Sequence, residues 1–114
     1  MLTVEEACTI AINYELNWGN TDPAVSYVRS DDTTYLVCVV SNCECFLPSC
    51  LMKVDKTSGE TQHCRSLDIP QSFEWIDYFE KKTQHEVPEK YKQKRFPLEE
   101  MHKALLAVSV PSEV

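Results

Sequence analysis

The sequence predicts an α+β fold: an N-terminal helix packed on a four-stranded antiparallel meander, then a second helix and a C-terminal arm with a short third helix. Three observations predict it: apolar residues at helical spacing near the N-terminus, an apolar run suited to a central strand, and a strand–turn–strand pattern at residues 51–60. The 114 residues suffice for a single domain. We expect residues 1–82 to form the helix-sheet-helix core and residues 83–114 a basic arm with the C-terminal helix.

The first helix is expected to begin after Thr3. Thr3 and Glu6 match a capping box, in which each side chain accepts a hydrogen bond from the other residue's backbone amide. Apolar residues then recur at steps of three and four, so one stripe of the helix faces a core. The stripe consists of Val4, Ala7, Cys8, Ala11 and Tyr14. The segment 17–23, which contains Gly19, ends the helix.

Two strands are predicted at residues 24–30 and 33–41, joined by a turn at Asp31-Asp32. Within the second strand, residues 35–40 are apolar on both faces, which is typical of a central strand covered on both sides. The chain then enters a connecting loop that includes Phe46 and Leu47. A meander of this kind requires only short turns between neighbouring strands.

A hairpin is predicted from strands 49–55 and 60–66. Asp55 can accept hydrogen bonds from the amides that follow it, and Gly59 can adopt the positive φ that closes a tight turn. The last strand is mostly polar, as an exposed edge strand would be. This hairpin is the most specific local signal in the chain, and it indicates architecture rather than chemistry.

Residues 71–82 predict a second amphipathic helix, because Phe73, Ile76 and Phe79 recur at helical spacing and Trp75 extends the apolar face. Residues 83–97 are polar and basic and are interpreted as a connecting arm with at most short helical pieces. Pro97 then opens a third helix. The expected core comprises Val4, Ala7, Ala11, Tyr14, Leu36, Cys38, Val40, Leu51, Val54, Ile76 and Phe79.

Charge is unevenly distributed along the chain. Residues 1–80 hold 4 Lys/Arg against 13 Asp/Glu, a net charge of −9, whereas residues 81–114 hold 7 against 5, a net charge of +2. An acidic field disfavours nucleic acid and anionic membrane as partners and favours a basic protein, although it can also serve solubility alone. The acidic N-terminus does not match a signal peptide, so we expect a cytoplasmic protein. The basic run 90–96 is interpreted as an arm that pairs with the acidic face.

The candidate partner-binding residues combine carboxylates with an apolar loop. Phe46 and Leu47 can form an exposed anchor of the kind that carries binding energy, or they can fold back to cap the core. Carboxylates, with Glu80 as a further member, would rim such an anchor. The candidate set is Asp31, Asp32, Glu44, Phe46, Leu47, Glu74 and Asp77.

Six cysteines raise the alternatives of a zinc site and of cysteine chemistry. A metal site would use Cys43, Cys45, Cys50 and Cys64, perhaps with His63, but the spacing departs from that of structural zinc sites, and buried free cysteine is the commoner outcome. A cysteine nucleophile would need a nearby base. His63 and Cys64 are adjacent in a strand and should point to opposite faces, while His85 and His102 are expected to be solvated. We expect no cofactor and no catalysis.

The segments Leu-Thr-Val-Glu-Glu-Ala-Cys-Thr-Ile-Ala at residues 2–11 and Met-Lys-Val-Asp-Lys-Thr-Ser-Gly-Glu at residues 52–60 resemble the small bacterial immunity proteins of polymorphic toxin systems, including the YrhB-type domains. The resemblance covers residues 1–80. It implies a first helix packed on an antiparallel sheet and a non-enzymatic inhibitor that binds a cognate toxin in the cytoplasm. Two other functions remain open: a cysteine-based zinc-binding or redox-sensing module, and an acidic phage-type inhibitor that mimics nucleic acid.

Overall fold

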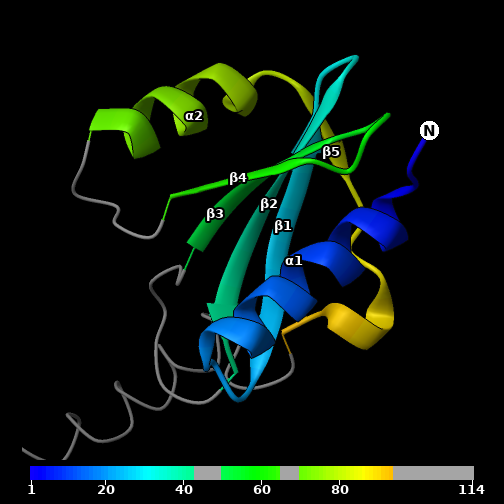
Figure 1. Cartoon of the computed structure of the whole chain (residues 1–114). Helices are drawn as coiled ribbons and strands as arrows, with labels where there is room; N and C mark the ends of the chain where they lie inside the picture. Colours follow the sequence, from blue (N-terminus) through cyan, green and yellow to red (C-terminus); the bar gives the residue numbers. More distant parts are fainter. Residues whose placement is uncertain (43–49, 65–69, 94–114) are drawn as a thin grey trace, which may run out of the picture.

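A five-stranded antiparallel sheet lies between two helices in the computed structural model, which describes residues 1–42, 50–64 and 70–93 (Figure 1). The strand order is β4-β3-β2-β1-β5. The elements are α1 (Val4–Trp18), β1 (Pro23–Ser30), β2 (Thr34–Ser41), β3 (Cys50–Asp55), β4 (Thr61–Cys64), α2 (Pro70–Glu80), β5 (Thr83–His85) and a 3-10 helix (Glu89–Tyr91).

The predicted α+β class, the first helix, the order of the first four strands and the second helix are confirmed. The predicted strand number is wrong, because residues 83–85 leave the expected arm and pair with β1 as a fifth strand. The 3-10 helix agrees with the expected short helical piece in the arm. The predicted third helix lies outside the described residues.

Helix α1 begins and ends at the residues that the sequence indicates. The Thr3 amide donates to Glu6 Oε1 at 2.9 Å and the Glu6 amide donates to Thr3 Oγ1 at 3.1 Å, which completes the capping box. Gly19 ends the helix with a φ of +115°, and its amide donates to the Leu16 carbonyl. No helix in the described part of the chain has the length and apolar character needed to cross a membrane.

The β3–β4 turn has the predicted geometry. Asp55 Oδ1 accepts from the amides of Thr57 and Ser58 at 2.9 and 2.8 Å. The Gly59 amide donates to the Asp55 carbonyl, and Gly59 has a φ of +77°. A left-handed residue at this place is favourable only for glycine, so the Asp–Gly pair fixes the turn and the register of the hairpin.

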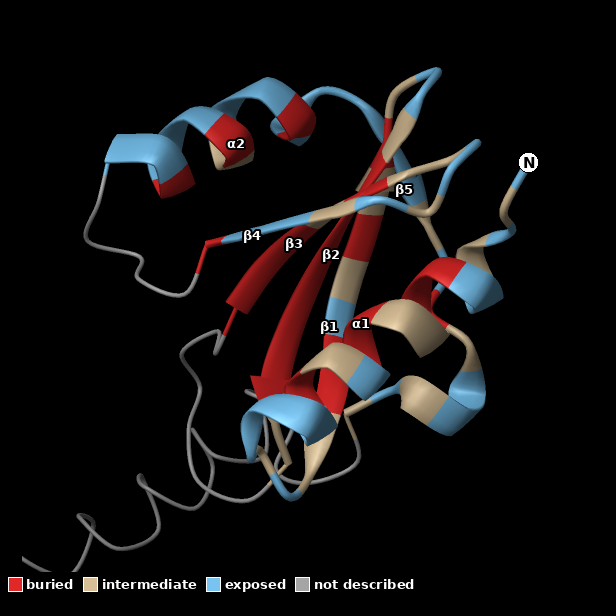
Figure 2. Cartoon of the chain, viewed as in Figure 1, coloured by how far each residue is buried: buried red, intermediate tan, exposed pale blue. Residues whose placement is uncertain are grey.

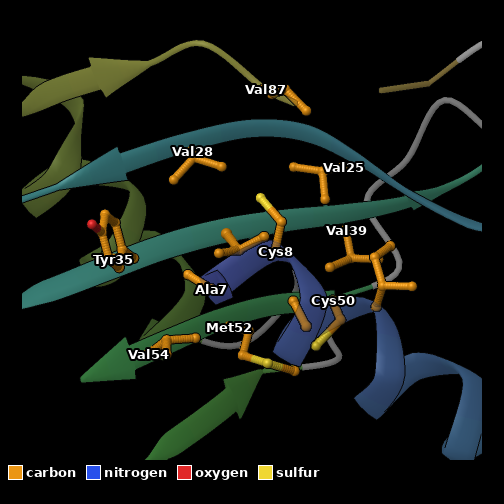
Figure 3. Packing of buried hydrophobic residues seen from close by; sticks show 13 residues of the cluster. Ala7, Cys8, Val25, Val28, Tyr35, Val39, Cys50, Met52, Val54 and Val87 are labelled. Atoms are coloured by element: carbon orange, nitrogen blue, oxygen red, sulfur yellow. The ribbon is translucent and has the colours of Figure 1, made fainter. Parts of the chain in front are cut away.

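Each face of the sheet carries its own core cluster. On one face, Ala7, Cys8 and Ala11 of α1 pack among valines of β1, β2 and β3 and against Met52 (Figure 3). Figure 2 shows the central strands as the most continuously buried part of the molecule. Most of the expected core residues are buried. Three of them, Val4, Tyr14 and Ile76, are half-buried and pack against the clusters.

The second face packs against α2 through Trp75 and Phe79, which contact residues such as Leu36. The predicted apolar stripe of this helix is partly wrong, because Phe73 is 57% exposed and Ser72 is fully buried. The buried side of α2 is therefore formed by residues 72, 75 and 79.

Residues 83–93 run along the outer edge of β1 and then reach α1. His85 pairs with Val28, Val87 is buried, and Lys92 forms a parallel bridge with Val25. The Tyr91 hydroxyl makes a hydrogen bond with the Thr9 hydroxyl of α1. The first part of the basic arm is therefore built into the domain.

Candidate functional site

One hydrogen bond connects α2 with the turn between β1 and β2. The Tyr78 hydroxyl donates to Asp31 Oδ2 at 2.8 Å, although the two residues are 47 positions apart in the sequence. The bond holds the acidic turn against α2, and we call the turn carboxylates together with the exposed aromatic and acidic residues of the helix the helix–turn surface. It consists of Asp31, Asp32, Phe73, Glu74, Asp77, Tyr78 and Glu80.

Asp31 organises the turn as well as the link to α2. Its Oδ1 atom accepts from the Thr33 and Thr34 amides at 2.9 and 2.8 Å. Burial raises the pKa of Asp31, but the hydrogen bonds from Thr33, Tyr78 and Thr34 outweigh burial, so its pKa lies below the ordinary value. The same bond raises the pKa of Tyr78. Asp31 thus stays ionised as a structural carboxylate, whereas Asp32 is exposed.

The outer face of α2 carries two exposed aromatic and three exposed acidic side chains. Phe73 is 57% and Tyr78 is 52% exposed, and Glu74, Asp77 and Glu80 are exposed beside them. The helix contains no lysine or arginine. Exposed aromatic side chains are enriched at the centres of protein interfaces. The structure thus exposes the Phe73 side chain, which the sequence pattern placed on the apolar face of the helix.

The predicted loop residues Glu44, Phe46 and Leu47 lie outside the described residues. The strand ends that flank their loop are Ser41 and Cys50. Ser41 is the last residue of β2 and Cys50 is the first residue of β3, whereas Asp31 and Asp32 lie just before the first residue of β2. Eight strand residues span about 26 Å. The structure therefore brings the turn together with α2, and not with the strand ends that enter the loop.

The sheet separates two of the cysteines that the alternative zinc site would use. Cys50 belongs to the core cluster on the α1 face, and Cys64 belongs to the cluster on the α2 face, where its Sγ lies 2.7 Å from Ser72 Oγ. These two thiols cannot bind one metal ion without breaking the sheet. Cys43 and Cys45 lie outside the described residues. Among the residues that the structure describes, no three His, Cys, Asp or Glu side chains are placed to hold a metal ion.

Two further buried thiols are poorly suited to nucleophilic or redox chemistry. Burial raises the pKa of Cys8 to about 11 and the pKa of Cys38 to about 12. Since the thiolate is the reactive form, both side chains act as small apolar residues near neutral pH. Neither residue therefore supports the redox-sensing alternative.

The two histidines in the described part of the chain occupy different environments, and His102 lies outside it. His63 faces α1, with its ring 4.8 Å from the Tyr14 ring, so the prediction that it points away from Cys64 is confirmed. The prediction that His85 is solvated is wrong: it is half-buried in β5, and its Nε2 lies 2.6 Å from Ser30 Oγ. Burial, aided by the Lys56 charge, lowers the pKa of His85. Ser30 is only 3% exposed, and its contact with His85 joins β1 to β5 at the side of an open depression that both residues help to line.

Lysines border the helix–turn surface. Lys56 Nζ donates to the Asp31 carbonyl at 2.7 Å, and Lys82 Nζ lies 4.8 Å from the centre of the Tyr78 ring. With Lys81 they line an open depression of about 670 Å³ next to the acidic residues. The charge therefore changes sign at this border, which would define the orientation of a charged partner.

Comparison of the chain with protein-family models, with curated proteins and with solved structures finds no match. The function is therefore inferred from the residues and the geometry of this chain.

Proposed function

We propose that this protein is an immunity protein: a non-enzymatic inhibitor that binds a cognate bacterial toxin in the cytoplasm and covers its active site or substrate channel. The observation that carries the proposal is the Tyr78–Asp31 hydrogen bond, which holds the acidic turn against a helix that bears three exposed carboxylates and two exposed aromatic rings. The resemblance of residues 2–11 and 52–60 to immunity proteins supports the same function.

The charges of the helix–turn surface favour a basic partner. Its five carboxylates, two in the turn and three on α2, contribute to the net charge of −7 of the whole chain. Complementary charge mainly raises the rate of association. The exposed rings of Phe73 and Tyr78 would then be buried in the complex, and burial of aromatic anchors mainly slows dissociation. Together these two effects suit an inhibitor that must capture its toxin quickly and hold it.

Co-expression with the protein encoded immediately upstream tests this function. We expect a stoichiometric complex that survives purification, and relief of growth inhibition when both proteins are present. A neighbour that is harmless alone, or that is toxic and neither binds nor is neutralised, would contradict the proposal for that pair.

Charge reversal tests the surface itself. Asp32→Lys and Glu74→Lys should slow association by about tenfold at low ionic strength, with a smaller effect at high salt, because both remove steering charge. Asp31 is left intact because it organises the turn. Glu89→Lys is the matched control: it makes the same charge change at a side chain 88% exposed, on the 3-10 helix that packs beside α1. Equal effects for all three variants would indicate a net-charge effect without a specific surface.

A further inference from the structure

A pocket of about 420 Å³ lies between α2 and the sheet beside the helix–turn surface. Leu36 and Phe79, both almost fully buried, form its apolar floor together with the half-buried Ile76. Tyr27 of β1 forms part of its wall. The pocket therefore offers an apolar channel wide enough for a side chain that enters from solvent.

Two carboxylates stand at the mouth of this pocket. Asp77 and Glu80 both line it and are exposed, and their spacing of three residues makes them neighbours on the helix surface. Neither forms a salt bridge with any other residue that the structure describes. The mouth can therefore accept several hydrogen bonds from a cation.

Arg29 also lines the pocket, but its guanidinium is already engaged. Nη1 donates to the carbonyls of Glu80 and Lys82 at 2.9 and 3.2 Å, and Nη2 donates to Gln84 Oε1 at 3.2 Å. A cation at these carbonyls stabilises the C-terminal end of α2. Arg29 thus fixes the helix end and leaves the carboxylates of Asp77 and Glu80 to an external ligand.

We infer that this pocket receives an arginine side chain of the protein partner. The inference rests on the proposed function, because it names the partner chemistry that the acidic surface would recognise. The apolar stem of the arginine would lie along Leu36, Ile76 and Phe79, and the planar guanidinium would reach both carboxylates. Arginine fits better than lysine, since its fork of N–H donors can bond two carboxylates at once and its guanidinium is less strongly hydrated than an ammonium group.

Titration of the isotope-labelled protein with Nα-acetyl-arginine amide, followed by amide chemical shifts, tests the pocket without the toxin. We expect saturable shifts centred on Tyr27, Ile76 and Asp77, with a dissociation constant of about 1–10 mM for so small a ligand. The lysine analogue should bind more weakly. The citrulline analogue, which has the same shape without the charge, should give no saturable shift.

Variants locate the effect at the two carboxylates. Asp77→Asn and Glu80→Gln should each weaken arginine binding by about two- to fivefold, the range of an exposed charged pair. Glu89→Gln is the matched control, because it removes one charge at a side chain that is 88% exposed and lies outside both the pocket and the helix–turn surface, and it should bind like the native protein. The spectra also report whether each variant remains folded.

Equal binding of the citrulline analogue, or equal weakening by Glu89→Gln, would overturn the inference. So would a toxin complex whose affinity is unchanged by Asp77→Asn and Glu80→Gln together, although the proposed function would then stand. Conversely, specific arginine binding by a protein that captures no toxin would support the pocket and remove the immunity function.

Discussion

At the scale of single residues, Tyr78 has two roles that its sequence position does not reveal. Its ring is half-exposed on α2, and its hydroxyl holds the Asp31 carboxylate of a distant turn. The turn is also held by the amides of Thr33 and Thr34. Removal of the hydroxyl should therefore loosen the contact between helix and turn while the turn keeps its own hydrogen bonds.

Tyr78→Phe should raise the pKa of Asp31, because one of the hydrogen bonds that stabilise its charged form is lost. A carboxyl group with a lowered native pKa contributes stability above its unfolded pKa, and this stability disappears as the pH falls through the native pKa. The variant should therefore lose less stability than the native protein on acidification. Carboxyl-carbon NMR titration and urea unfolding at neutral and acidic pH measure both effects.

Tyr91→Phe provides the control for this substitution. It removes a hydroxyl that bonds Thr9 on the other side of the molecule, so the pKa of Asp31 should not change. An Asp31 pKa that is the same in the Tyr78→Phe variant and in the native protein would show that the bond from Tyr78 contributes nothing to this carboxylate in solution.

At the scale of secondary-structure elements, the β3–β4 hairpin depends on the backbone of one residue. A Cβ added at Gly59 would meet Leu2 Cδ1 at 3.5 Å, an ordinary contact, so the space around it is not the constraint. The φ of +77° is the constraint, since side chains disfavour the left-handed region. The register of β4 on β3 therefore depends on a conformation that glycine supplies.

Gly59→Ala should lower the free energy of unfolding by about 1–2 kcal/mol, the cost of a left-handed residue with a Cβ. Gly59→Asn should cost less, because asparagine tolerates this conformation better. Thr57→Ala, at an exposed side chain in the same turn, should change stability by no more than about 0.5 kcal/mol. Urea unfolding of the three variants measures these differences, and an alanine variant as stable as the native protein would exclude strain at Gly59.

Elements with local signals could be predicted from the sequence, and elements without them could not. The capping box at Thr3 and the Asp55–Gly59 turn involve contacts between near neighbours, so their residue types suffice. Strand β5 consists of only three residues, all of them polar, and it forms because it pairs with the edge of β1. On α2, Ser72 rather than Phe73 faces the sheet, where the helix approaches Cys64 closely enough for a 2.7 Å contact.

At the scale of the whole molecule, residues 83–93 complete the domain at two places. They pair with β1 through β5, and they contact α1 through Tyr91 and through Lys90, whose Nζ lies 3.5 Å from Glu5 Oε1. The sequence predicts that the helix-sheet-helix core of the single domain ends at residue 82, and that the basic arm pairs with the acidic face of the sheet. The topology assigns residues 83–85 to the sheet, and Lys90 pairs with Glu5, which belongs to α1 and not to the sheet.

A chain truncated after Lys82 should therefore be less stable than one truncated after Gln93. The shorter chain loses the β5 pairing, the buried Val87 side chain and the Tyr91 contact with α1. Burial of one valine alone contributes about 1.5 kcal/mol or more, and exposure of the β1 edge adds to the loss. Denaturant unfolding of both chains measures the difference, and equal midpoints would mean that residues 83–93 do not stabilise the fold.

The candidate surface shows why function is harder to predict than elements. In the sequence, only their charge marks Asp31, Asp32, Glu74 and Asp77 as candidates. The contact between the turn and α2 results from the return of the helix across the sheet to the β1–β2 turn, which no local pattern encodes. The hydrogen bond between Ser30 and His85, which are 55 residues apart in the sequence, depends in the same way on the order of the strands in the sheet.

Both outer strands of the sheet are short, with four residues in β4 and three in β5. Such edges offer few backbone groups for another chain to extend as a further strand, which is the usual route to fibrous aggregation. The proposed inhibitor would benefit from such edges, because a chain that resists polymerisation can be present at the concentration of its toxin or above it. Recognition of the toxin through side chains of a helix, instead of a sheet edge, would be consistent with this property.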